Sequence, residues 1–429
     1  MSQTSDFTPE KNLYGLSLFW REATYHFAFW DKLSHLDWDG EYIKLMPEVA
    51  KADTKERYFL LLKKFSALLK DGHTDIRWGD LASYPLDRPE ADVLKVGDKI
   101  VVQQAYGEYA SQIPVGSEVI EVDGVPIAKA IDNYMDTYMA NHNEASVPIK
   151  ASRFALAGPS GSIAAVKMIA PGEEDPFILR MPRYARSIAS PAVKRPTLQF
   201  EQFAGGVVYC AINSFMDTHM LKEFESKMEE LARAKGVIFD LRRNPGGNGD
   251  DAFSILQKLT KKKIYSSCCR TPIHDAALTA EETDWGKGTR MRHERIIEPD
   301  VWEGSGELAH IPIVMLISAE TESAAEDMVS AADYSGVATL IGEATSGSTG
   351  NSLLFPLPYG LWGQICVKWD AYPDGREFVG CGVKPHILVK NTVEDICLGV
   401  DRVLETAIHF LKESLLKSER REPTDADKD

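Results

Sequence analysis

Hydrophobic and polar positions follow a helical period near the start of the chain. After Asp53, apolar residues recur every three or four positions: Tyr58, Leu61, Leu62, Phe65, Leu68 and Leu69. The spacing of Asp53 to Glu56 is that of a capping box, and Gly72 stands where a glycine often ends a helix. The pattern predicts helices over residues 8–72, the clearest of them beginning at Asp53.

The pattern then changes to short apolar runs separated by glycine and proline. Val119–Val122, followed by Asp123-Gly124, predicts a strand that enters a tight turn. From about residue 195, strands alternate with helices. The predicted strands are 205–212, 237–241 and 313–318, and the predicted helices are 220–234, 251–259, one from Ser323, and 393–416. Such alternation is typical of an α/β core.

These patterns divide the chain into four parts. We expect an N-terminal helical domain over 1–88, a β domain over 89–190 and an α/β core over 191–416. The charged composition of 417–429 predicts a disordered tail. The stretch 272–308 is charged and without clear periodicity, and we expect it to be an insertion.

The composition excludes several classes of protein. The chain has 429 residues, of which 44% are hydrophobic and 26% charged, as in a folded globular protein. Its longest strongly apolar run, 311–319, is far shorter than the ~20 residues of a membrane-spanning helix. Acidic residues outnumber basic ones, 64 to 48, and the resulting charge of −16 argues against general nucleic-acid binding. The sequence does not indicate an oligomeric state.

Cysteines and the chain start bear on the compartment. No C-x-x-C spacing occurs among the six cysteines, so neither a disulfide framework nor a structural zinc site is expected. Four of them have apolar neighbours and are predicted to be buried free thiols: Cys210, Cys366, Cys381 and Cys397. The first residues lack the features of a signal peptide. This predicts a cytoplasmic protein, or a periplasmic or secreted one if a signal peptide has been trimmed.

Four segments hold residues suited to chemistry. Residues 237–248 form an apolar strand and then a turn whose paired glycines expose backbone N–H groups. Residues 321–326 place Ser323 at a helix N-terminus, where free N–H groups favour negative charge. The other two are the glycine-containing loop 342–350 and the segment 70–74.

Each segment also has a simpler interpretation. Ser323 and Glu326 fit S-x-x-E, so Ser323 could only cap its helix. Gly246 and Gly247 could only make a turn, and His73 could be a satisfied histidine in a domain interface. The joint occurrence and order of the segments favour the functional interpretation.

Together the segments resemble the tail-specific, or C-terminal processing, family of serine peptidases, in particular its tricorn-like branch. The match covers most of the chain. The motifs that carry it are Asp71–Thr74, Asp240–Gly247, Ser323–Glu326, Gly342–Gly347 and Gly382–Pro385. In addition, residues 113–127 resemble the second half of a PDZ module.

The resemblance implies an α/β fold: a ClpP/crotonase-like core of stacked β-β-α units, with a PDZ-like domain inserted ahead of it. It also implies a serine peptidase that forms an acyl-enzyme and needs no metal or organic cofactor. Ser323 is the implied nucleophile, and the N–H groups of Ala324 and of Gly246 or Gly247 are the implied oxyanion donors. The expected substrates are peptides or unfolded protein segments.

The general base is assigned to His73. In the lysine-dependent branch of the family a lysine stands at the position of Ser348, and between residues 264 and 367 this chain has only Lys287, in the charged insertion. A histidine side chain, with an unperturbed pKa of about 6.5, suits the task. His73 is the histidine that lies in a matching motif, so we expect it to take the proton of Ser323.

The residue that orients the base stays open among Glu377, Asp71 and Ser348. In tricorn-like proteins a glutamate near the Gly-Val-x-Pro stretch supports the site. The matching position here is Val379, and Glu377, two residues earlier, lies on the same side of a strand. The residue after that stretch is usually aspartate in the family and is His386 here.

Two further functions stay open. The first is a non-catalytic ligand- or peptide-binding protein on the same scaffold, because Val379 replaces the family's glutamate. The second is dinucleotide binding, since Gly247-x-Gly249-x-x-Ala252 formally fits the nucleotide fingerprint. That fit is poor, because Asp250 and Asp251 would face the pyrophosphate at the helix start.

Overall fold

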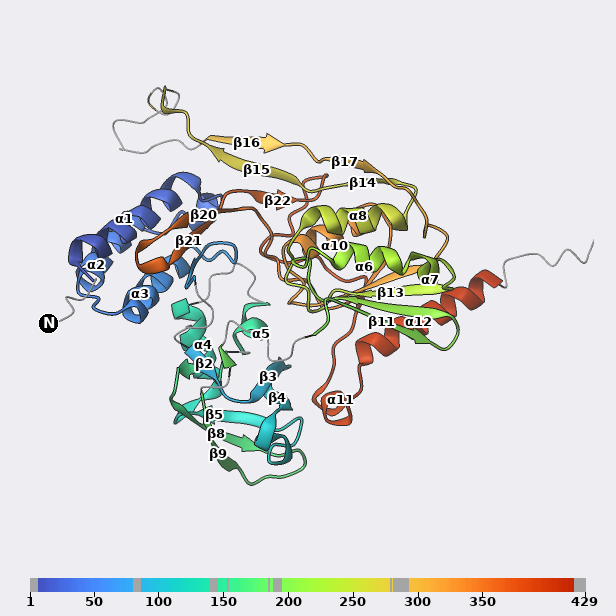
Figure 1. Ribbon diagram of the computed structural model, residues 1–429, viewed down its shortest axis with the longest axis horizontal. Helices are drawn as coiled ribbons and strands as arrows, with labels where there is room; N and C mark the ends of the chain where they lie inside the picture. The colour runs from blue at the N-terminus through green and yellow to red at the C-terminus, as the bar shows by residue number, and fades with distance from the viewer. Residues whose placement is uncertain are drawn as a thin grey trace, which may run out of the picture. The chain divides into compact units, whose positions relative to one another are not determined.

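The chain forms two compact units, each assembled from segments that are distant in sequence (Figure 1). The computed structural model describes residues 7–79, 86–138, 146–152, 154–183, 186–187, 195–277, 280 and 293–419. The first unit contains residues 1–192, 268–298 and 348–380, and the second contains 193–267, 299–347 and 381–429. The four-part division expected from the sequence stays a prediction.

The first unit begins with the predicted helices, α1 (Pro9–His26), α2 (Trp38–Ala50) and α3 (Lys55–Ala67). The Thr54 hydroxyl caps α3 by accepting from the Arg57 N–H at 3.2 Å, so the predicted capping box at Asp53 is wrong. The predicted stop at Gly72 is also wrong, because α3 ends at Ala67 and the left-handed residue after it is Lys70 (φ 48°).

A small antiparallel sheet follows α3. Its order is β1 (Asp75–Arg77), β21 (Trp362–Cys366) and β20 (Ser352–Pro356). The pairing of β1 with β21 brings the segment after α3 beside a strand almost 290 residues later, as in the register Asp75 to Gln364. Another three-stranded sheet of this unit consists of β16 (His293–Ile297), β15 (Cys268–Ile273) and β22 (Trp369–Ala371).

The predicted β domain contains a sheet with its own hydrophobic core. The strand order is β3 (Ala91–Val96), β4 (Lys99–Ala105), β5 (Glu118–Val122), β8 (Ile163–Ile169) and β9 (Phe177–Pro182), with β6 (Val125–Pro126) beside β5. Helices α4 (Ile127–Tyr138) and α5 (Val147–Ser152) accompany it. The strand predicted at 119–122 is confirmed, and Asp123 and Gly124 have the positive φ angles (51° and 77°) of a hairpin turn.

The second unit is built on a six-stranded, mostly parallel sheet. The order is β11 (Leu198–Phe203), β12 (Val207–Ile212), β13 (Gly236–Asp240), β18 (Ile313–Ile317), β19 (Thr339–Gly342) and β23 (Ile387–Leu388), with only β11 antiparallel to its neighbour. Every residue of β13 and β18 is buried, as expected of central strands in a parallel sheet. The predicted α/β alternation is confirmed.

The helices of this unit are shorter than predicted in two places. The helix expected at 220–234 is two helices, α6 (Met220–Ser226) and α7 (Met228–Ala232), which meet at Lys227. The helix expected at 393–416 is α11 (Val393–Leu398) and α12 (Arg402–Glu419), separated by the left-handed Gly399. The other two are α8 (Gly249–Leu259) and α10 (Ala324–Tyr334).

Some expectations fall partly outside the described residues. Helix α12 continues to Glu419, past the predicted start of the tail, and residues 420–429 lie outside the described range. The predicted insertion contains β16 and β17 (Val301–Glu303), which pairs with β14 (Lys263–Tyr265), and its residues 281–292 lie outside that range.

The cysteines differ in their burial. Cys210 and Cys366 are buried as predicted, whereas Cys381 and Cys397 are exposed, so their predicted burial is wrong. As for membrane insertion, no helix among the described residues has the length and apolar character needed to cross a bilayer.

Candidate active site

Two neighbouring strands of the parallel sheet end in the loops that carry most candidate residues. Strand β13 ends at Asp240 and leads into the glycine turn, residues 244–248. Strand β18 ends at Ile317 and leads to Ser323, which immediately precedes α10. Because β13 and β18 are parallel neighbours, both loops leave the sheet at the same edge.

Three hydrogen bonds join these two loops. The Glu322 N–H donates to the Asn244 carbonyl at 3.0 Å. The Thr321 hydroxyl donates to the Leu241 carbonyl at 2.9 Å, and the Ser318 hydroxyl donates to the Arg242 carbonyl at 2.6 Å. The glycine turn and the loop before α10 are therefore held as one structure.

The backbone at Ser323 is strained. Its φ of 55° and ψ of −129° lie in a region that side-chain-bearing residues rarely occupy, and its side chain makes no capping hydrogen bond with α10. Strain of this kind costs about 1–3 kcal/mol and clusters at functional sites. A sharp, strained strand-to-helix turn is also how α/β-hydrolases expose a nucleophilic serine.

Glu326 does not complete a capping box either. It is fully buried, and its Oε1 accepts from the Gly347 N–H at 2.5 Å and from the Thr345 hydroxyl. Thr345 in turn accepts from the Val383 N–H at 2.7 Å. The simpler interpretation of Ser323 as a helix cap is therefore wrong: the S-x-x-E motif instead anchors the loop 342–350.

The glycine turn packs directly against Ser323. A Cβ on Gly246 (φ 94°) would lie 2.6 Å from the Ser323 Cβ and 2.9 Å from the Ala324 nitrogen. A Cβ on Gly247 (φ 137°) would lie 2.3 Å from the Phe215 carbonyl carbon. Both positions therefore require glycine, for space and for backbone conformation.

The N–H groups near Ser323 differ in what they bond. The Gly246 N–H donates to the Asn244 Oδ1 at 2.8 Å. Gly247 forms an isolated β-bridge with Phe215. The two hydrogen bonds of this bridge run from the Phe215 N–H to the Gly246 carbonyl and from the Asn248 N–H to the Phe215 carbonyl, so they do not use the N–H of Gly247. Ala324 is the first residue of α10, where a helix provides no acceptor for the N–H. Of the predicted oxyanion donors, Gly247 and Ala324 are therefore stronger candidates than Gly246.

We expect Gly246→Ala to destabilise the second unit. The added methyl would contact the Ser323 Cβ and two backbone atoms, at 2.6–2.9 Å, in a left-handed backbone conformation. Such overpacking costs about 1–3 kcal/mol. Thermal unfolding would measure the loss of stability.

The matched control is Gly249→Ala, three residues later in the first turn of α8. A Cβ added at Gly249 would have no atom within 4 Å, and alanine is the better helix former by about 1 kcal/mol. This variant should be at least as stable as the wild type. A Gly246→Ala protein of unchanged stability would contradict the packing described above.

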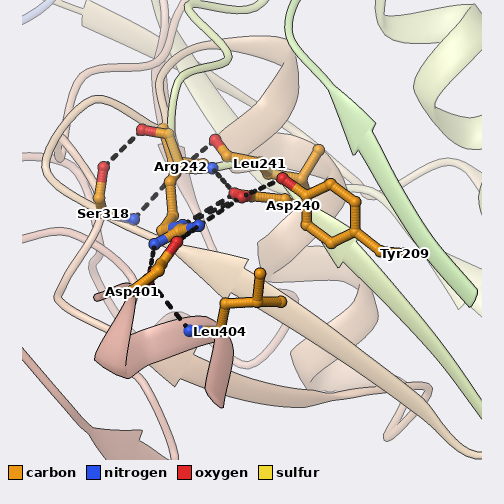
Figure 2. Close-up of polar contacts among 8 residues, drawn as sticks. Tyr209, Asp240, Leu241, Arg242, Ser318, Asp401 and Leu404 are labelled. Carbon is orange, nitrogen blue, oxygen red and sulfur yellow. Dashed lines mark hydrogen bonds and ion pairs between the residues drawn. The ribbon is translucent and has the colours of Figure 1, made fainter. Parts of the chain in front are cut away.

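A charged network anchors the strand that leads into the glycine turn (Figure 2). The Arg242 guanidinium lies between two carboxylates, with Nη2 2.6 Å from the Asp240 Oδ2 and 2.7 Å from the Asp401 Oδ2. Asp240 also accepts from the Tyr209 hydroxyl at 2.9 Å, and Asp401 accepts from the Leu404 N–H at 3.1 Å. The network thus links β12, β13 and the start of α12.

The network changes the ionisation of its members. Burial disfavours the charged Arg242, but the two carboxylates outweigh it and raise the pKa of Arg242. Burial opposes ionisation of Asp401, but the hydrogen bonds and charge of Arg242 outweigh it and lower the pKa of Asp401. Burial, with a contribution from Asp240, raises the pKa of Tyr209.

We expect Asp401→Asn to lower the free energy of unfolding by about 1 kcal/mol at neutral pH, because it weakens charge-assisted hydrogen bonds at a half-exposed position. The folded state holds Asp401 with a pKa below its ordinary 3.8, so this contribution is complete above that pH and is lost as the pH falls through the folded pKa. Urea unfolding from pH 7 to pH 2 would measure it. The difference between wild type and variant should shrink with acidity, and a constant difference would contradict the linkage.

His73 lies in the first unit, on the loop between α3 and β1. Its Nδ1 is 3.0 Å from the Ser348 hydroxyl oxygen. The loop is fixed by Thr74, which donates to the Asp71 Oδ2 at 2.6 Å and accepts from the Cys366 N–H at 3.0 Å. The structure thus places His73 against one of its three predicted orienting residues.

The other two predicted orienting residues have different contacts. Asp71 is buried and bonds Thr74 of its own loop. Glu377 is half-exposed and forms an ion pair with Lys32 at 3.0 Å. The 3.0 Å contact between His73 and Ser348 supports the prediction for Ser348, and the predictions for Asp71 and Glu377 stay open.

His386, where the family usually has aspartate, links two elements of the second unit. Its Nδ1 accepts from the Leu340 N–H of β19 at 2.9 Å, and its Nε2 lies 3.0 Å from the Asp333 Oδ1 of α10. These contacts account for the residue as part of the scaffold.

The predicted residues are thus brought together in two groups. The second unit joins Ser323 and Ala324 to the glycine turn with Gly246 and Gly247, and the first unit joins His73 to Ser348. The pairing of His73 with Ser323 involves residues of different units and stays a prediction. The supporting roles of Asn244 and Glu326 were not predicted from the sequence, although both residues lie in the recognised motifs.

Comparison with known proteins bears on these motifs. Residues 206–389 match the model of peptidase family S41. A carboxy-terminal-processing protease of Bartonella bacilliformis is 28% identical over 191 residues, which are 43% of this chain and 37% of that protein. The chain therefore matches little more than a third of this relative's length.

Solved structures share the fold over most of the chain. Mature CPAF complexed with lactacystin gives a TM-score of 0.71 at 15% identity, covering 95% of this chain and 98% of that one. The photosystem II D1 C-terminal processing protease gives 0.51 at 16% identity, with 90% and 96% covered. The tricorn protease gives 0.50 at 17% identity, with 95% and 37% covered. At such low sequence identity, the structural similarity shows a common mixed α/β fold.

The matched residues 206–389 contain the glycine turn, Ser323 and the loop 342–350. The resemblance to C-terminal processing peptidases is confirmed, and residues 206–389 are similar to peptidase family S41.

Proposed function

We propose that this protein is a serine peptidase that hydrolyses peptides or unfolded protein segments through an acyl-enzyme. The observation that carries the proposal is the strained turn at Ser323, whose side chain does not cap α10 and which packs against the glycine turn. A residue that served only to cap a helix would need neither feature. The S41 match over the same residues supports the proposal.

In the proposed reaction, the Ser323 Oγ attacks the carbonyl carbon of the scissile peptide bond while His73 Nε2 takes the serine proton. The N–H groups of Ala324 and Gly247 stabilise the oxyanion of the tetrahedral intermediate. The C–N bond then breaks, and the leaving amine takes the proton from His73. Water, deprotonated by His73, attacks the ester and releases Ser323 with its proton restored.

Ser348 is proposed to select the tautomer of His73. When Nδ1–H donates to the Ser348 Oγ, 3.0 Å away, Nε2 carries the lone pair that a base needs. Ser348 immediately follows Gly347, whose N–H is held by Glu326, three residues after the nucleophile. Gly347, the residue before Ser348, is therefore hydrogen-bonded to α10, the helix that follows Ser323.

The domain assignments belong to the same proposal. The parallel sheet of the second unit supports a ClpP/crotonase-like core, and the sheet β3–β9 with α4 and α5 supports a PDZ-like domain at 89–190. Such a domain would dock extended peptides. The name of the Bartonella relative, a carboxy-terminal-processing protease, makes chain ends the first substrates to test.

Digestion of unfolded casein and of a peptide library tests the proposal. We expect cleavage that a fluorophosphonate abolishes and that a chelator such as EDTA leaves unchanged, because the proposed mechanism involves no metal. Tight binding of peptides without any cleavage would instead indicate a binding protein on this scaffold.

A further inference from the structure

Asn244 connects three parts of the proposed site: the end of β12, the glycine turn and the residue before Ser323. It is fully buried. Its Nδ2 donates to the Ile212 carbonyl at the end of β12 at 3.0 Å, and its Oδ1 accepts from the Gly246 N–H at 2.8 Å. Its own carbonyl accepts from the Glu322 N–H at 3.0 Å, beside Ser323.

These bonds determine how the glycine turn presents its N–H groups. Gly246 and Gly247 have no side chains to restrict their rotation, so hydrogen bonds must fix the orientation of their peptide groups. The Asn244 side chain accepts from the Gly246 N–H, so this N–H is not available to an oxyanion. The Gly247 N–H is then the one in the turn that can donate to the oxyanion.

The chemistry of the position is specific. The side chain must accept from Gly246 at one end and donate to Ile212 at the other, and an amide does both with one planar group. Because Asn244 also binds Glu322 through its main chain, it sets the distance between the glycine turn and the residue before the nucleophile.

We propose that Asn244 is a positioning residue of the peptidase reaction: it holds the Gly247 N–H in the orientation that receives the oxyanion. This inference rests on the proposed function. It predicts that loss of the Asn244 side chain lowers kcat and leaves KM nearly unchanged, because the oxyanion exists only after the substrate has bound.

The test compares Asn244→Ala with Asn213→Ala. Asn213 lies in the same unit and also donates its Nδ2 to a main-chain carbonyl, that of Pro196 at 2.9 Å. We expect Asn244→Ala to lower kcat by about 10²-fold, the scale of a lost oxyanion donor, with KM changed by less than about threefold. Asn213→Ala should match the wild type in both constants.

Asn244→Asp gives a second readout if the alanine variant does not fold. A protonated aspartic acid can accept from Gly246 and donate to Ile212 as asparagine does, whereas the carboxylate cannot donate and adds a negative charge beside the oxyanion. The kcat of this variant should fall with rising pH through an ionisation that the wild type lacks. A purely structural role would change the melting temperature without adding an ionisation to kcat.

Hydrogen exchange of the backbone over 244–248, measured by mass spectrometry, gives a readout that needs no activity. Exchange should accelerate in Asn244→Ala and stay unchanged in Asn213→Ala. If the wild type cleaves peptides and a folded Asn244→Ala has wild-type kcat, or if Asn244→Asp has the wild-type pH profile, this inference fails alone. If the wild type cleaves nothing, the proposed function fails with it, whatever the exchange shows.

Discussion

Replacing Ser323 with alanine is expected to lower the kcat for peptide hydrolysis by at least about 10⁴-fold, because no acyl-enzyme can form without its hydroxyl. Binding of the peptide should persist, since the glycine turn and α10 remain. Steady-state kinetics on a cleaved library peptide would measure the loss. Ser330→Ala is the control, because it removes a buried hydroxyl from α10, the helix that follows Ser323. That hydroxyl donates to the Asp327 carbonyl at 3.0 Å.

The strained backbone adds a second expectation at this position. Ser323→Gly should be as inactive as Ser323→Ala but more stable than it, by about 1 kcal/mol, because glycine adopts a φ of 55° without steric cost. Thermal unfolding of the two variants would measure the difference. Equal stability of the two variants would contradict the strain inferred at Ser323.

Replacing His73 with alanine is expected to lower kcat by about 10³-fold or more, because the serine loses its general base. Stability should change little, since the loop is held by Thr74 and by the pairing of β1 with β21. Ser348→Ala should cost less, about tenfold, because it removes only the group that orients the imidazole.

The control for this series is His409→Ala, a largely exposed histidine on α12 that pairs with Glu413. A folded His73→Ala enzyme with wild-type kcat would exclude His73 as the base. Loss of kcat in His73→Ala together with full activity in Ser348→Ala would keep the base and exclude Ser348 as its orienting residue.

Local sequence patterns predict the parts of the fold that depend on local signals. Buried strands such as Ile313–Ile317 are unbroken apolar runs in the sequence, and the turn at Asp123-Gly124 has its own signature. The pairing of β1 with β21 has no local signal, because its two strands are almost 290 residues apart. The breaks at Lys227 and Gly399 interrupt amphipathic patterns that continue on both sides.

In the candidate site, too, the sequence predicts what a short motif contains and does not predict contacts between distant segments. The motifs predict Ser323 and the glycine turn, since each motif is a short contiguous string. The string Ser323–Glu326 fits both a capping box and the observed anchor of the loop 342–350, and only tertiary structure distinguishes them. The choice of Gly247 over Gly246 as donor likewise depends on a side chain, Asn244, whose role no spacing indicates.

Reaction with a fluorophosphonate, followed by peptide mapping, tests the central claim most directly, because the probe bonds covalently to activated serines. The proposed mechanism predicts a single label on Ser323 in the wild type, labelling at least about 10²-fold slower in His73→Ala, and none in Ser323→Ala. A label on another serine, no label at all, or equal labelling of the wild type and His73→Ala would contradict it.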